Sequence, residues 1–265
     1  MTGVLALAIA AFAPAARAQA PAESHAKLEL LAEDAAGKAS VTWVGILFRL
    51  DPGWHVYWQN PGDSGEPPKV KWDLPPGLKA GDIRWPTPIR LGSGSVIDYG
   101  YENQVLLMVP IQAGPGAPPE AAKQIAADVK YVVCREVCIP GKADLKLAAT
   151  SDGRAQVVKM FAETRERLPR KMPAGWRVSA TQNKDRFSIT ADIHKEVRSA
   201  AFFPMDAGEI ENSAPQQFAA LPDGFRLTLK KSDQLLKPVA SLHGLVVLGP
   251  DQAYDVTAPI HGQSD

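Results

Sequence analysis

The sequence predicts an all-β protein made of two β-sandwich domains that a short helix connects. Two observations lead to this prediction. The chain has 265 residues, of which 45% are hydrophobic and 22% charged, which is enough for two globular domains of modest size. Short apolar runs alternate with Pro and Gly along most of the chain, a pattern typical of strands joined by turns, and one stretch has helical spacing instead.

The first domain is expected between residues 24 and 150. Two of its loops, 60–65 and 74–77, are indicated by Pro and Gly, because Pro lacks the backbone donor and Gly favours turns. The spacing of the strands between such turns is typical of a sandwich. The candidate strands are residues 27–32, 39–50, 54–59, 70–73, 104–111, 125–133 and 142–149.

The connector is expected over residues 151–173, with a helix over 154–168 that Pro169 ends. Its apolar positions are Val157, Val158, Phe161, Thr164 and Leu168. A second, smaller β-sandwich follows over residues 174–260, and the polar tail 261–265 is expected to be disordered. The candidate strands of this domain are residues 176–180, 186–193, 200–203, 225–230, 242–248 and 253–258.

The N-terminus predicts export. Residues 4–16 are almost all apolar and run into Ala16-Arg17-Ala18, so residues 1–18 have the features of a cleaved signal peptide. The apolar run is shorter than the roughly 20 residues of a spanning helix, and no later segment is apolar enough, so the mature chain is expected to have no membrane span. The 29 basic and 29 acidic residues balance, and no basic stripe suggests a nucleic-acid partner.

Export permits disulfides, and the chain has two cysteines, Cys134 and Cys138. They flank a three-residue turn after an apolar strand, which is expected to bring their Cα atoms to about 4.4–6.8 Å, the range of a disulfide. Between them, Arg135 would favour a thiolate and Glu136 would oppose it.

Three functions are open to this pair. A closed loop of about five residues stabilises a fold by roughly 2 kcal/mol, against about 3 for fifteen residues, which makes a structural staple a weak explanation. An accessible bridge at a turn exchanges readily, which favours redox function. The alternatives are a non-catalytic envelope binding module with a structural disulfide and a Cu(I)-handling protein in which a methionine such as Met108 joins the thiols; no metal site is expected from ligand spacing.

The most distinctive stretch is residues 51–68. As a strand it places Trp54, Val56 and Trp58 on one face, as in a core strand, and His55, Tyr57 and Gln59 on the other. A functional interpretation makes it a surface that supports the cysteines. The candidate supporting residues are Trp54, Tyr57, Trp58, Arg135 and Glu136.

Four segments carry a resemblance to a known family: 51–68, Trp85-Pro86-Thr87-Pro88, 97–104 and 131–140. They resemble the periplasmic N-terminal domain of the thiol:disulfide interchange protein DsbD, and most of all the branch associated with suppression of copper sensitivity (ScsB-like), in which three residues separate the cysteines. The likeness covers residues 28–149 and continues more weakly through 201–204 and 242–244.

The resemblance implies an immunoglobulin-like sandwich in the periplasm and a protein-disulfide reductase-type oxidoreductase that needs no cofactor. It implies that Cys138 attacks the partner disulfide and that Cys134 resolves the mixed disulfide. It also implies a cap loop over the pair, with Tyr99 and Tyr101 as the covering aromatics. The cap loop would consist of Asp98, Tyr99, Gly100, Tyr101 and Glu102.

The implied partners are a membrane-embedded thiol electron donor and oxidised periplasmic proteins. The resemblance does not extend to the transmembrane and thioredoxin-like domains of full-length relatives. We therefore expect a stand-alone version, part of a split system, or a product of gene fission.

Overall fold

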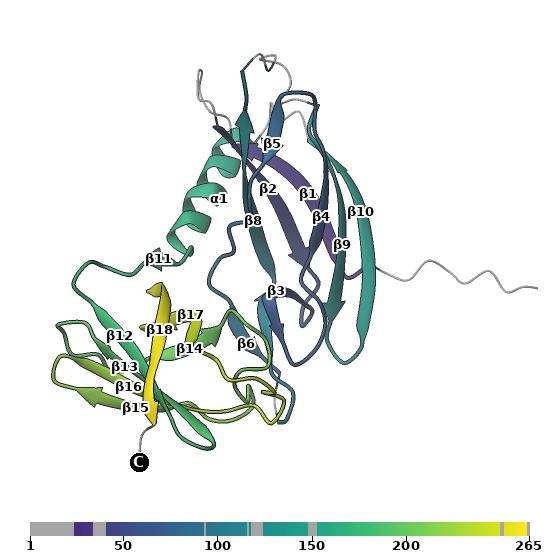
Figure 1. The fold of residues 1–265 in the computed structure, drawn as a ribbon. Coiled ribbons are helices and arrows are strands. Elements are labelled where there is room, and N and C mark those ends of the chain that lie inside the picture. The colour runs from purple at the N-terminus through teal and green to yellow at the C-terminus, as the bar shows by residue number, and fades with distance from the viewer. Residues whose placement is uncertain are drawn as a thin grey trace, which may run out of the picture.

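The computed structural model describes residues 24–33, 41–92, 94–115, 117, 124–147, 153–249 and 252–263. The expected signal peptide, residues 1–18, lies outside this part of the chain. Within it the fold is nearly all β, which confirms the predicted class, and it forms two lobes (Figure 1). No helix among these residues is long and apolar enough to cross a membrane.

The first lobe is a sandwich of two sheets. One has the strand order β1 (Ala26–Glu33), β2 (Val41–Leu50), β8 (Gln104–Ala113) and β5 (Leu78–Ala80). The other has the order β10 (Cys138–Lys146), β9 (Ala126–Cys134), β3 (His55–Gly62), β7 (Asp98–Glu102) and β6 (Ile89–Leu91), with β4 (Lys69–Asp73) also beside β9. Alternate residues of both sheets, such as Ile46, Val56 and Val129, form the core between them.

Several predicted boundaries of the first domain are corrected. β3 continues to Gly62, because Gly62 still pairs with Asp98 after an irregularity in the register, so the predicted loop begins three residues later. β10 begins at Cys138, since this residue pairs directly with Cys134. The short strands β5, β6 and β7 were not predicted, and β7 replaces the expected cap loop.

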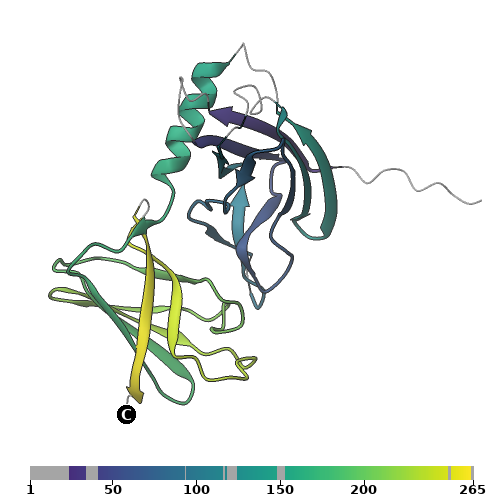
Figure 2. The same cartoon turned by 45° about the horizontal axis from the view of Figure 1, so that its top comes forward.

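Helix α1 (Arg154–Glu166) covers the outer face of the four-stranded sheet (Figure 2). Val157, Met160 and Phe161 pack there against a group of apolar side chains. That group consists of Leu31, Leu47, Leu106 and Met108. Val158, predicted on the apolar side, is 43% exposed, and Met160 takes a buried place instead. The helix is therefore part of the first domain's packing as well as a connector.

The second lobe is built around one long strand, β18 (Ala253–Gln263). Its first part pairs with β11 (Arg170–Lys171) and β17 (Ser241–Val247), and β17 pairs with β14 (Ala201–Pro204). Its last residues pair with β12 (Arg177–Gln182), which leads to β13 (Arg186–Asp192), β16 (Gly224–Lys230) and β15 (Gln217–Leu221). The two halves thus share one continuous sheet around a second core.

The predicted disordered tail is wrong for residues 261–263. They continue β18, because Gln263 still pairs with Gln182 of β12. β11 and β15 are further strands that the sequence pattern did not predict.

The packing of α1 can be tested with Phe161→Ala. Because the Phe161 ring is fully buried, its removal should lower the free energy of unfolding by about 3–5 kcal/mol. Val158→Ala, on the exposed side of the same helix, should change it by less than about 0.5 kcal/mol. Guanidinium unfolding followed by Trp fluorescence measures both, and equal losses would contradict the described packing.

Candidate functional site

Cys134 and Cys138 form a disulfide across the end of the β9–β10 hairpin, with Cα atoms 4.1 Å apart. The predicted three-residue turn is confirmed, and the Arg135 N–H donates to the Val137 carbonyl across it at 3.2 Å. The Cα distance is slightly below the predicted range. Pairing along the whole hairpin places the disulfide at the end of the six-stranded sheet.

The two cysteines differ in exposure. Cys134, at the end of β9, is 3% exposed, whereas Cys138, at the start of β10, is exposed. The turn between them projects into solvent, and the Val137 side chain is 63% exposed. Of the two cysteines, Cys138 is therefore the one open to solvent.

Tyr57 contacts both sulfurs through its hydroxyl. Its hydroxyl donates to Cys134 Sγ at 2.7 Å and lies 3.6 Å from Cys138 Sγ. Burial raises the pKa of Tyr57 above its ordinary value, so the hydroxyl keeps its proton and remains a donor. A donor here stabilises negative charge on the buried sulfur.

Ser64 lies against the Tyr57 hydroxyl and is itself bound to Asp98, and we call Tyr57, Ser64 and Asp98 the hydroxyl chain. Ser64 Oγ donates its one proton to Asp98 Oδ2 at 2.8 Å. It lies 3.2 Å from the Tyr57 hydroxyl, whose own proton goes to Cys134 Sγ, so Ser64 and Tyr57 touch without sharing a proton. The Ser64 N–H donates to Asp98 Oδ1 at 2.9 Å. His55 Nε2 is 3.7 Å from Asp98 Oδ2, beyond hydrogen-bond length but within ion-pair distance.

Asp98 is held in its ionised form. Burial raises its pKa, but the interactions with His55 and Ser64 outweigh burial, so the pKa of Asp98 lies below its ordinary value. As a carboxylate, Asp98 accepts both hydrogen bonds that Ser64 donates and so fixes the position of Ser64.

The loop after β3 covers the Tyr57 ring. Gly65 has a φ of 66°, and a Cβ at this position would lie 2.0 Å from the ring. Only glycine permits both this backbone conformation and this approach. Ser64 and Gly65 are residues of the candidate site that were predicted only as part of a turn, although the dense Asn-Pro-Gly-Asp-Ser-Gly run was a signal that could have found them.

The other predicted supporting residues lie in the turn, beside it or in the core. The Arg135 guanidinium lies 5.5 Å from the centre of the Trp54 ring, so Trp54 supports the turn. Trp58 lies in the core, where its ring meets that of Tyr99 edge-on. Glu136 is exposed in the turn.

The predicted cap loop is wrong in its secondary structure. Asp98–Glu102 is strand β7 within the six-stranded sheet, because it pairs with β3 and β6. Tyr99 and Tyr101 are buried, and their hydroxyls donate to Asn212 Oδ1 at 2.8 Å and to the Pro86 carbonyl at 2.7 Å. Asp98 is the residue of this segment that belongs to the hydroxyl chain.

Met108, considered as a third copper ligand, packs against α1 on the far sheet. Among the residues that the structure describes, no three His, Cys, Asp or Glu side chains are grouped as metal ligands. His55 pairs in register with Cys134, a proximity that sequence spacing did not predict.

The hydroxyl chain can be tested with Tyr57→Phe. In the reduced protein Tyr57 would donate to the Cys134 thiolate, and a hydrogen bond to a charged group is worth about 1.5–3 kcal/mol. Its loss destabilises the reduced form and should favour the disulfide about tenfold in equilibrium with glutathione, or about 30 mV in potential. Tyr131→Phe is the matched control, because the Tyr131 hydroxyl is near Ser24 rather than the sulfurs. Equal potentials for Tyr57→Phe and the wild type would refute the contact.

The ionised state of Asp98 predicts a pH dependence. Since its folded pKa is depressed, its contribution to stability is present above the unfolded value of about 3.9 and is lost as pH falls through the folded pKa. The free energy of unfolding of the wild type should therefore fall more steeply between about pH 5 and pH 2 than that of Asp98→Asn. Parallel pH profiles from urea unfolding would contradict this.

Comparison with known proteins bears on the family and the fold. Residues 27–150 match the family model described as thiol:disulfide interchange protein DsbD, N-terminal. The crystal structure of the N-terminal periplasmic domain of ScsB from Proteus mirabilis aligns with a TM-score of 0.65 at 18% identity, over 93% of this chain and 97% of that chain. This likeness shows a shared fold across both lobes.

Weaker structural matches do not indicate a shared fold. The periplasmic chaperone SfaE aligns with a TM-score of only 0.22 at 7% identity, over 89% of this chain and 100% of that chain. No curated protein sequence matches the chain. The resemblance that the motifs predicted is confirmed by the family model and the ScsB structure.

Proposed function

Because residues 27–150 belong to the family of DsbD N-terminal domains, we propose that this chain is a periplasmic thiol:disulfide exchange protein. It would pass reducing equivalents from a membrane-embedded thiol donor to oxidised envelope proteins through Cys134 and Cys138. The observation that carries the proposal is the asymmetry of the pair, with one exposed cysteine and one buried cysteine whose sulfur accepts a hydrogen bond from Tyr57.

The reduced protein would act in two balanced steps. The Cys138 thiolate attacks one sulfur of the partner disulfide, a mixed disulfide forms, and the partner's other sulfur leaves as a thiolate. The Cys134 thiolate then attacks Cys138 Sγ, which closes the Cys134–Cys138 disulfide and releases the partner with both electrons. The donor dithiol reverses these steps on the oxidised protein and becomes a disulfide itself.

The hydroxyl chain would stabilise negative charge on Cys134 both when the pair is being oxidised and when it is being reduced. When the mixed disulfide forms on Cys138, negative charge resides on Cys134, whose sulfur accepts the Tyr57 hydrogen bond. A charge-assisted hydrogen bond is about twice as strong as a neutral one. Cys134 is therefore a better leaving group when the disulfide is attacked, and a stabilised thiolate before it resolves the intermediate.

The decisive measurement is the reduction potential of the mature protein in graded glutathione buffers, with free thiols trapped and counted by mass. A value of about −180 to −270 mV supports exchange, whereas a value below about −300 mV makes the bridge structural. The second result would favour the binding module.

Single cysteine variants test the assigned roles. Cys134→Ser should form a mixed disulfide with oxidised glutathione at the exposed Cys138 at least about tenfold faster than Cys138→Ser forms one at the buried Cys134. Mass spectrometry of quenched time points measures both rates, and each variant serves as the control for the other. Equal rates, or the reverse order, would overturn the assignment of Cys138 as the attacking sulfur.

A further inference from the structure

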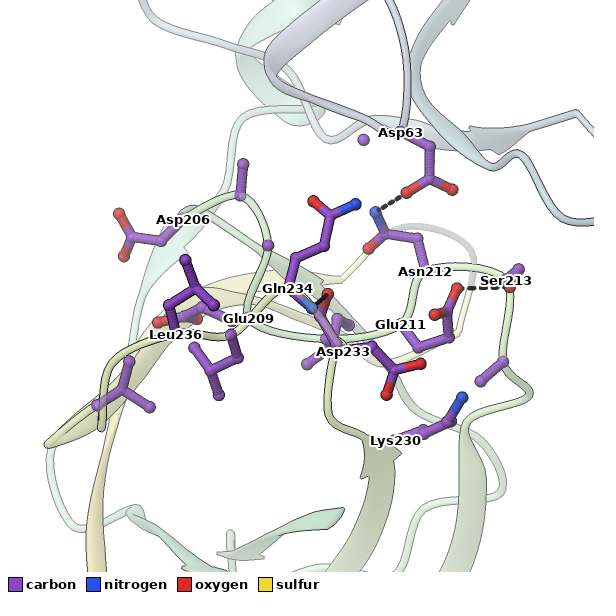
Figure 3. A pocket seen from close by; sticks show the side chains of 18 of the residues that line it. Asp63, Asp206, Glu209, Glu211, Asn212, Ser213, Lys230, Asp233, Gln234 and Leu236 are labelled. Atoms are coloured by element: carbon purple, nitrogen blue, oxygen red, sulfur yellow. Dashed lines mark hydrogen bonds between the residues drawn. The ribbon is translucent and has the colours of Figure 1, made fainter. Parts of the chain in front are cut away.

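One residue of the second lobe holds two segments of the first. Asn212, in the loop between β14 and β15, is 8% exposed. Its Nδ2 donates to Asp63 Oδ1 at 2.7 Å, and its Oδ1 accepts from the Tyr99 hydroxyl at 2.8 Å. Figure 3 shows the side chains of Asn212 and Asp63 pointing toward each other; both residues line a pocket to which both lobes contribute. The Asn212 carbonyl also accepts from the Arg90 guanidinium at 2.5 Å.

Both side chains that Asn212 holds are adjacent in sequence to the hydroxyl chain. Asp63 immediately precedes Ser64, and Tyr99 immediately follows Asp98. Asp63 Oδ2 also accepts from the Ile97 N–H at 2.8 Å, which ties the loop after β3 to the start of β7. A shift of either segment would move the Ser64–Asp98 pair against which the Tyr57 hydroxyl lies.

The lobes are packed together at this point. The rings of Phe203 and Tyr99 meet with centroids 5.3 Å apart, and Phe203 and Leu245 of the second lobe belong to the core of the first. Asn60, also in the segment before Ser64, donates from Nδ2 to the Pro204 carbonyl at 2.8 Å. The second lobe therefore contacts this segment at several buried atoms.

We propose that the second domain sets the reactivity of the Cys134–Cys138 pair, with Asn212 as a positioning residue. By holding Asp63 and Tyr99, Asn212 keeps the hydroxyl chain in the arrangement in which Tyr57 donates to Cys134. The inference rests on the proposed exchange function for its biological meaning. The physical coupling can be measured independently of that function.

The test exchanges the donor and the acceptor of the Asp63–Asn212 pair. Asn212→Asp keeps the acceptor for Tyr99 but sets two carboxylates against each other, which should displace Asp63 and loosen the hydroxyl chain. Adding Asp63→Asn restores a donor facing an acceptor and keeps an oxygen for the Ile97 N–H. The readout is the equilibrium constant of the full mature chain with glutathione, determined by thiol trapping.

We expect Asn212→Asp to favour the disulfide about threefold, equivalent to about 14 mV for a two-electron couple. The Asp63→Asn/Asn212→Asp double variant should return to within about 1.5-fold of the wild type, since the paired hydrogen bond is restored. In a Tyr57→Phe background, Asn212→Asp should cause no further change, because its effect acts through the Tyr57 hydroxyl. Asn183→Ala, in the β12–β13 turn of the same domain, should leave the equilibrium unchanged.

An Asn212→Asp variant with a wild-type equilibrium constant would overturn the inference. So would an effect that persists without the Tyr57 hydroxyl, or a double variant that stays displaced. The exchange function is tested separately by the wild-type value: a constant in the range of structural disulfides refutes that function, while the differences among the variants still decide the coupling.

Discussion

The alternation of side chains along β3 is the constraint on which the site depends. Trp54, just before the strand, and Val56 and Trp58 within it belong to the core between the sheets, and successive side chains of a strand point to opposite faces. Tyr57 must therefore face away from that core, towards the end of the β9–β10 hairpin. A shift of one residue in the register would bury Tyr57 among the core residues and leave Cys134 without its donor.

The hairpin gives the disulfide two unlike sulfurs. β9 lies inside the six-stranded sheet, paired with β3 as well as with β10, so its last residue is covered, whereas β10 lies at the edge and its first residue is exposed. A symmetric pair would let a partner attack either sulfur. In the proposed exchange, this topology would direct a partner to Cys138 and leave Cys134 to the Tyr57 hydroxyl.

Local patterns in the sequence were sufficient for some features and insufficient for others. The Trp54–Trp58 alternation predicted the core face, and the spacing of Cys134 and Cys138 predicted the turn. The family resemblance implied a loop at Asp98–Glu102, whereas pairing with β3 and β6 makes the segment a strand. The contact between Asn212 and Asp63 joins residues 149 positions apart, and no local pattern carries such a contact.

The position of the second lobe argues against a loosely tethered module. A tethered module would bury little apolar surface and would leave domain motion free. Here Phe203 and Leu245 extend the first core, and Asn212 satisfies Tyr99, whose buried hydroxyl would otherwise be costly. Because the same contacts adjoin Ser64 and Asp98, the first domain's site would lose its support if the lobes separated. The two lobes are therefore best understood as one unit, in which a domain without cysteines completes the surroundings of a disulfide that it does not touch.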